Sequence, residues 1–125
     1  MTAWRMPIEG HPQSRLWLAW PTTGYTLGDT EAEADEARRT WAAVANAASE
    51  FQPVTVVVNP GDEEVARRHL SSAIDLLPAP LDDAWMRDIG PSFVIGDDGT
   101  LGAVDFVFNG WGGQGWAEWG KDRHI

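Results

Sequence analysis

The stretch DDAWMRD, residues 82–88, places three aspartates, one arginine and one tryptophan within seven residues. Trp85 precedes Asp88 by three positions, and a Gly-Pro pair follows before an apolar segment. A carboxylate can pair through two hydrogen bonds with a planar cation such as guanidinium. An indole face can stack on the same cation. Trp85 and Asp88 are therefore candidate ligands for a small planar cation.

The same residues also allow a purely structural interpretation. An internal bridge between Arg87 and an aspartate could tie the loop together, with Trp85 as a plug in the core. Clustered charges are often structural, so spacing alone favours neither interpretation.

A second segment of interest is FNGWGGQG, residues 108–115, which follows an expected strand. Its glycines permit a close backbone approach or a positive φ. It lacks the Lys-Ser/Thr ending of a phosphate-binding loop. Glycine clusters are common in ordinary loops, so the pattern by itself favours a flexible loop.

The chain contains 8 tryptophans in 125 residues. Trp17 and Trp41 are expected in the core, because both lie within apolar patterns. Four others fall in the second half, where they could line an aromatic ligand surface, including a sugar site. This is the basis of a binding-module hypothesis. The four are Trp85, Trp111, Trp116 and Trp119.

The residue types and their spacing do not indicate a metal site or a Ser-His-Asp or Cys-His catalytic arrangement. The sequence has no cysteine, which excludes disulfides and thiolate metal sites within it. His11, His69 and His124 have no metal-ligand spacing, and we expect all three at the surface.

The net charge of −10 narrows the class of partner. An acidic surface repels phosphate backbones and anionic lipid, so nucleic acid and membranes are poor candidates, whereas a cationic small molecule is attracted. No apolar run approaches the roughly 20 residues of a membrane span. The N-terminus lacks the apolar core of a secretory signal, so a cytoplasmic location is expected.

The first half of the chain alternates strands and helices. Residues 15–21 and 54–58 have the composition of buried strands. Between them, Thr30 and Glu33 have the spacing of a capping box at the start of a long amphipathic helix. Its expected core face comprises Ala34, Ala37, Trp41, Val44, Ala48 and Phe51.

The second half begins with a helix expected from Asp62, as N-cap, to about Ser72, and then a strand at 73–77. Strands at 92–96 and 101–109 flank a hairpin turn, and the last residues indicate the start of another helix. Alternating strands and helices favour an α/β fold in one domain.

Four segments make the sequence resemble the agmatine deiminase and bacterial-type peptidylarginine deiminase family. They are MPIEGHPQSRLWLAWP, VTVVVNP, DDAWMRDIGPSFV and FNGWGG, in this order, and together they extend over nearly the whole chain. The resemblance implies a pentein-like α/β propeller, of which about two of the five ββαβ modules would lie within residues 1–125.

The resemblance also implies an activity. Family members hydrolyse a guanidinium, in agmatine or in peptidyl arginine, to a ureido group and release ammonia, without a metal or organic cofactor. A cysteine thiolate attacks the guanidinium carbon, a histidine acts as general acid and base, and two carboxylates hold the nitrogens. By motif position, Asp88 resembles one of these carboxylates, and Trp85 resembles an aromatic residue of the substrate site.

The sequence departs from the family pattern in what it lacks. The family cysteine and histidine lie in later segments, so residues 1–125 are expected to be the N-terminal portion of a single deiminase domain, inactive alone. The alternative is a non-catalytic relic or cation-binding module. Neither the choice between agmatine and peptidyl arginine nor a homo-oligomeric state follows from the sequence.

Overall fold

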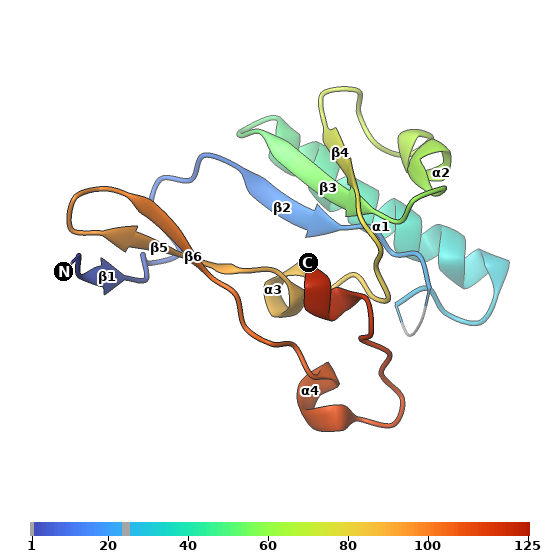
Figure 1. Cartoon of the computed structure of the whole chain (residues 1–125). Coiled ribbons are helices and arrows are strands. Elements are labelled where there is room, and N and C mark those ends of the chain that lie inside the picture. The colour runs from blue at the N-terminus through green and yellow to red at the C-terminus, as the bar shows by residue number, and fades with distance from the viewer. Residues whose placement is uncertain (1, 24–25) are drawn as a thin grey trace.

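The computed structural model describes residues 2–23 and 26–125 and contains two three-stranded sheets (Figure 1). One sheet is parallel, with the order β2 (Leu16–Ala19), β3 (Val54–Val58), β4 (Asp75–Pro78). Every residue of β3 is buried, as its β-branched run predicts for a central strand covered on both faces. The strands expected at 15–21, 54–58 and 73–77 are thus confirmed, with small shifts of their ends.

Helix α1 (Glu31–Ser49) connects β2 to β3 and covers one face of the parallel sheet (Figure 1). The expected capping box is present. The Glu33 backbone N–H donates to Thr30 Oγ1 over 3.2 Å, and the Thr30 backbone N–H donates to Glu33 Oε2 over 2.9 Å. These bonds satisfy two donors that a helix start leaves without intrahelical partners.

We expect Thr30→Ala to lower the free energy of unfolding by about 1 kcal/mol at pH 7. Hydrogen bonds from Thr30 and from the Asp29 backbone lower the pKa of Glu33 below its usual value near 4.5. The ionised Glu33 side chain therefore stabilises the folded state fully at pH values above its unfolded pKa. This contribution is lost as the pH falls through the lowered pKa of the folded state. Urea denaturation at several pH values should therefore show the difference from wild type narrowing below pH 4.5. A constant difference, or an equal loss in the mid-helix control Thr40→Ala, would contradict this.

The buried face of α1 is rotated from the one expected. Val44 and Phe51 are 54% and 87% exposed, so their assignment to the core face is wrong. The buried residues are Ala34, which was expected, and Ala42 and Ala45, which were not. Trp41 and Ala48 of the expected face pack against the core as partly buried residues. Small side chains let the helix lie close to the sheet, so the alanines, rather than the larger apolar residues, determine which face is buried.

The core has one cluster on each face of the parallel sheet. Trp20, only 1% exposed, is the largest fully buried side chain of the described residues, and it belongs to the cluster under α1. Trp17 and Trp41, expected in the core, are half-buried and pack against the second cluster. That cluster contains Ala19, Val57, Leu81, Ala84 and Ile89.

Helix α2 (Glu63–Arg67) is shorter than the predicted 62–72. Asp62 occupies the N-cap position but has helical backbone angles, φ −95° and ψ −1°, and makes no capping hydrogen bond. An N-cap normally has β-region angles, which aim its side chain at the first turn. The Asp62 carboxylate instead accepts a hydrogen bond from the Thr22 hydroxyl.

The second sheet is antiparallel and lies to one side of the α/β layer (Figure 1). Its strand order is β1 (Trp4–Arg5), β5 (Ser92–Gly96), β6 (Leu101–Val104). The β5–β6 hairpin is confirmed, although β6 ends five residues before the predicted position 109. The fold is mixed α/β, as predicted, and neither three-stranded sheet closes on itself.

The remaining elements are short. Helix α3 (Met86–Ile89) and helix α4 (Gly110–Gly113) were not expected, and each falls within one of the two motifs. The expected last helix is reduced to a 3₁₀ turn, η1 (Asp122–His124). Among the described residues, no helix combines the length and apolarity that crossing a bilayer requires.

Candidate active site

The loop that follows β4 carries the first motif, and it is fixed at the carboxyl end of the parallel sheet. Asn59, which directly follows β3, binds both polar groups of the Leu81 backbone. Its Oδ1 accepts from Leu81 N over 2.7 Å, and its Nδ2 donates to Leu81 O over 2.9 Å. Ligands of open α/β sheets bind outside the carboxyl ends of the strands, so the motif lies where this fold places sites.

Helix α3 presents Trp85 and Asp88 from a single helical turn. The Asp88 backbone N–H donates to the Trp85 carbonyl over 2.9 Å. The Trp85 ring packs edge-on against Trp41, with centroids 5.8 Å apart and planes at 67°. Trp85 remains 39% exposed, so it is supported by the core but is not the core plug of the structural interpretation.

The structure brings the two motifs together at Asp88. Trp111 of the glycine-rich segment donates its indole N–H to Asp88 Oδ1 over 3.2 Å. Within residues 2–23 and 26–125, the second carboxylate oxygen of Asp88 makes no hydrogen bond and no ion pair. Asp88 therefore has one oxygen bound to Trp111 and acceptor capacity left for a ligand.

The glycine-rich segment forms a tight turn that includes α4. Trp111 has φ 53° and ψ 41°, in the left-handed region that bulky residues rarely adopt. The Asn109 side chain closes the turn by accepting from Gly112 N over 2.9 Å. The Trp111 ring is supported by Phe108, edge-on at 5.1 Å, and by Trp116, stacked at 5.4 Å.

Sequence reasoning placed Trp111 on a possible aromatic ligand surface but did not predict its contact with Asp88. The available pattern was a glycine on each side of this tryptophan, which permits a reversal of the backbone. Strained backbone of this kind costs of the order of 1–3 kcal/mol and gathers at functional sites.

Arg87 does not form the bridge that the structural interpretation requires. Its guanidinium pairs with Glu9, at 3.2 Å, and both side chains are largely exposed. Arg87 and Asp88 are neighbours on a helical turn, where side chains point about 100° apart. The cation of the motif is therefore held away from Asp88.

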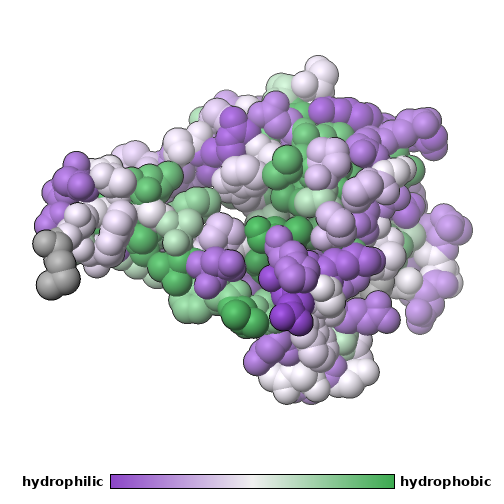
Figure 2. All heavy atoms as spheres, viewed as in Figure 1, coloured by the Kyte–Doolittle hydropathy of each residue, from purple (hydrophilic) through white to green (hydrophobic). Residues whose placement is uncertain are grey.

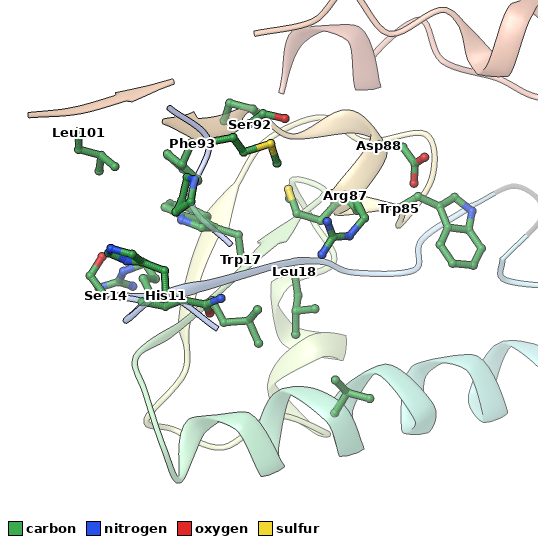
Figure 3. Close-up of a pocket in the computed structure, with 18 of the residues that line it drawn as sticks. His11, Ser14, Trp17, Leu18, Trp85, Arg87, Asp88, Ser92, Phe93 and Leu101 are labelled. Carbon is green, nitrogen blue, oxygen red and sulfur yellow. The ribbon is translucent and has the colours of Figure 1, made fainter. Parts of the chain in front are cut away.

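A groove of about 1110 Å³ runs beside the motif. Trp85 and Asp88 lie at one end of it, Trp17 lines its middle, and His11 and Ser14 lie at the other end (Figure 3). The groove is open and Asp88 is exposed, so water reaches the carboxylate.

The histidines do not gather at this site. His124 is exposed, as expected, whereas His11 and His69 are half-buried, and His69 packs beside Trp20 with ring centroids 6.0 Å apart. In the part of the chain that the structure describes, no group of three or more His, Asp or Glu residues could hold a metal ion.

Three aspartates, Asp82 and Asp83 before α3 and Asp122 at the start of η1, are buried. Asp122 accepts from the backbone N–H groups of Asp82, over 2.7 Å, and Asp83, over 3.0 Å. Burial raises the pKa of Asp122 to about 6, although these hydrogen bonds oppose the increase. Asp82 in turn accepts from Lys121 N over 2.7 Å and pairs with Lys121 Nζ at 3.0 Å, which raises the pKa of Lys121.

Comparison with known proteins supports the resemblance of the motifs. The family described as Porphyromonas-type peptidyl-arginine deiminase matches residues 5–125. A protein of Streptomyces coelicolor is 52% identical over 121 residues, which are 97% of this chain and 35% of that protein. The agmatine deiminase of Pseudomonas putida is 40% identical over 126 residues, covering 96% of this chain and 33% of that enzyme.

The fold gives the same result. The solved structure of the agmatine deiminase of Enterococcus faecalis superposes with a TM-score of 0.83 at 36% identity, over 96% of this chain and 33% of that one. This chain thus spans about a third of the length of the relatives it matches. It belongs to the Porphyromonas-type peptidyl-arginine deiminase family.

Proposed function

We propose that residues 1–125 are the N-terminal portion of a single deiminase domain that hydrolyses agmatine to N-carbamoylputrescine and ammonia. The observation that carries this proposal is the hydrogen bond from Trp111 to Asp88, because it joins the two motifs beside Trp85. The names of the Pseudomonas putida and Enterococcus faecalis relatives support agmatine as the substrate. The pathway would then be putrescine synthesis in the cytoplasm.

Asp88 would hold the guanidinium of the substrate. A carboxylate offers about four acceptor positions, and the Trp111 N–H occupies one of them. The remaining positions suit a planar group with N–H donors and a full positive charge. The Trp85 indole, half-exposed beside the carboxylate, offers a face for stacking on the same cation.

The ion pair between Arg87 and Glu9 helps this arrangement. An arginine bound to Asp88 would compete with a guanidinium substrate for the same oxygens. With Arg87 held by Glu9, its charge is partly balanced and Asp88 stays accessible. The net charge of −10 further favours the approach of a cation.

The rest of the catalytic machinery would come from the part of the domain beyond these residues. We use the term half-site for Trp85, Asp88 and Trp111. It lacks three groups that the family resemblance implies, namely the thiolate nucleophile, the histidine and a second carboxylate. If that further part of the domain covered the open groove, it would also exclude water. Excluding water strengthens the attraction between Asp88 and a cation. The proposed hydrolysis needs neither a metal nor an organic cofactor. Self-association of the whole protein is compatible with this arrangement.

We expect the 125-residue chain alone to release no ammonia from agmatine, because it has no thiol for covalent attack. A deiminase chimera, in which residues 5–125 replace the matched segment of the Pseudomonas putida enzyme, should restore ammonia release. Ammonia release by the chain alone, above a boiled control, would contradict the first expectation.

The deiminase chimera also separates the competing functions. Turnover of an arginine-containing peptide without turnover of agmatine would assign the peptidyl-arginine class. A folded chimera that binds agmatine without turnover, beside an active parent enzyme, would favour a non-catalytic cation-binding module.

A further inference from the structure

Asp82 and Asp122 form a reciprocal clasp between two segments about 40 residues apart. Asp122 Oδ1 accepts from the Asp82 N–H, and Asp82 Oδ2 accepts from the Lys121 N–H, each over 2.7 Å. The Asp83 N–H also donates to Asp122, and Lys121 Nζ pairs with Asp82. We call these four residues the clasp.

We propose that Asp122 is a positioning residue: through the clasp it holds the glycine-rich segment against the loop before α3, so that Trp111 reaches Asp88. This inference rests on the proposed function, because it assigns Asp122 to the half-site that would bind the guanidinium.

Three of the four clasp residues are buried, and the fourth, Lys121, is exposed. Asp122 is fully buried, and Asp82 and Asp83 are 6% and 7% exposed. Hydrogen bonds to a charged acceptor are stronger than neutral ones. A buried N–H left without an acceptor is also strongly unfavourable. Residues 82–83 and 121–122 are therefore held together, because moving them apart would leave buried polar groups without hydrogen-bond partners.

The contact that the clasp supports is weak by comparison. The Trp111–Asp88 hydrogen bond is 3.2 Å long and exposed, and a bond of this kind contributes little by itself. It would not hold together two loops that are separated by 23 residues of chain. The clasp, immediately before Trp85 and ten residues after Trp111, supplies the missing constraint.

Two further contacts fix the same geometry. Asn59 holds Leu81, so the loop is bound both at the end of β3 and at Asp122. On the other segment, Trp119 lies so close to Gly110 that a Cβ there would be 2.1 Å from its ring. The turn that carries Trp111 is thus packed against the chain that leads into the clasp.

The test uses the 125-residue chain labelled with ¹⁵N, in which the indole N–H of Trp111 is assigned by comparison with Trp111→Phe. In Asp122→Asn, the amide oxygen can still accept, but its NH₂ donors face the backbone donors of Asp82 and Asp83. We expect the Trp111 indole resonance to move toward that of a free indole. In the deiminase chimera, kcat/KM should fall about tenfold or more.

Asn46→Ala is the matched control, because Asn46 clamps a different loop by donating to His69 O and accepting from Ser71 N. It should lower Tm and leave the Trp111 resonance in place. A folded Asp122→Asn with an unmoved resonance, or an equal shift in Asn46→Ala, would overturn the inference. If Asp122→Asn does not fold, Lys121→Ala decides, since it removes the half-exposed Nζ, which pairs with Asp82 and donates to Leu81 O, and leaves the backbone bonds of the clasp in place. An unmoved resonance in folded Lys121→Ala would overturn the inference too.

The readouts distinguish the two proposals. The indole resonance reports whether the clasp positions Trp111, whatever the chain binds. A shifted resonance in Asp122→Asn, together with a wild-type deiminase chimera that neither binds nor turns over agmatine, would support the clasp and reject the proposed function.

Discussion

Asp88→Asn in the deiminase chimera is expected to lower kcat/KM by at least about 100-fold, or roughly 3 kcal/mol of transition-state stabilisation. Asparagine keeps the shape but removes the charge, and charge-assisted hydrogen bonds are about twice as strong as neutral ones. Its NH₂ group would also face a ligand that offers only donors. Tm should change little, because Asp88 is exposed and its one side-chain hydrogen bond, to Trp111, is exposed as well.

Measuring kcat/KM and Tm on the same Asp88→Asn sample separates binding from structure. A lower Tm with activity within tenfold of wild type would reject the guanidinium site. Trp85→Ala is the companion variant, and it should mainly weaken binding, because stacking on a cation contributes about 0.5–2 kcal/mol.

Trp20→Ala should have the largest effect on stability, lowering the free energy of unfolding by about 3–5 kcal/mol. Trp20 is 1% exposed and belongs to the buried cluster that α1, α2 and β3 share, so its removal leaves a large cavity. For a domain of this size, Tm should fall by more than about 10 °C in a thermal scan followed by circular dichroism.

Phe51→Ala is the control for this prediction. Phe51 is equally apolar in the sequence pattern but 87% exposed, so we expect a change within about 0.5 kcal/mol. Equal losses in Trp20→Ala and Phe51→Ala would contradict the prediction, because it rests on the difference in burial between the two side chains.

Local patterns predicted those parts of the fold that local forces determine. The β-branched run of β3, the Thr30–Glu33 capping box and the turn between β5 and β6 each depend on residues close in sequence. The rotation of α1 was missed because the 3.6-residue period identifies an apolar stripe but not which edge of it the sheet covers. Helix α2 begins where predicted but ends early at Arg67, because Asn46 of α1, 23 and 25 positions away, binds His69 O and Ser71 N just beyond it.

Several apolar side chains remain at the surface between the hairpin end and the α1 end of the molecule (Figure 2). Exposed residues of this kind include Met6, Ile8, Leu101, Phe106 and Val107. Leu101, Phe106 and Val107 belong to the apolar run that predicted a strand at 101–109, and none of the three is buried.

In the candidate site too, local patterns identified some residues, whereas contacts between distant parts of the chain determine the others. Trp85 and Asp88 could be singled out because three residues separate them in one motif. The pairing of Trp111 with Asp88 and the role of Asp122 could not be predicted, since they depend on contacts between residues 23 and 40 positions apart. No spacing rule links such positions before the chain is folded.

The clasp also turns the chain between residues 82 and 122 into a non-covalent ring, with the β5–β6 hairpin at a distance from its closure. An insertion in the hairpin turn lies far along the chain from the clasp, so it leaves the clasp contacts in place. Lengthening a flexible loop also costs little conformational entropy. The exposed turn at Asp97–Thr100 is therefore a position where a tag or reporter peptide can be inserted while both ends of the ring remain anchored.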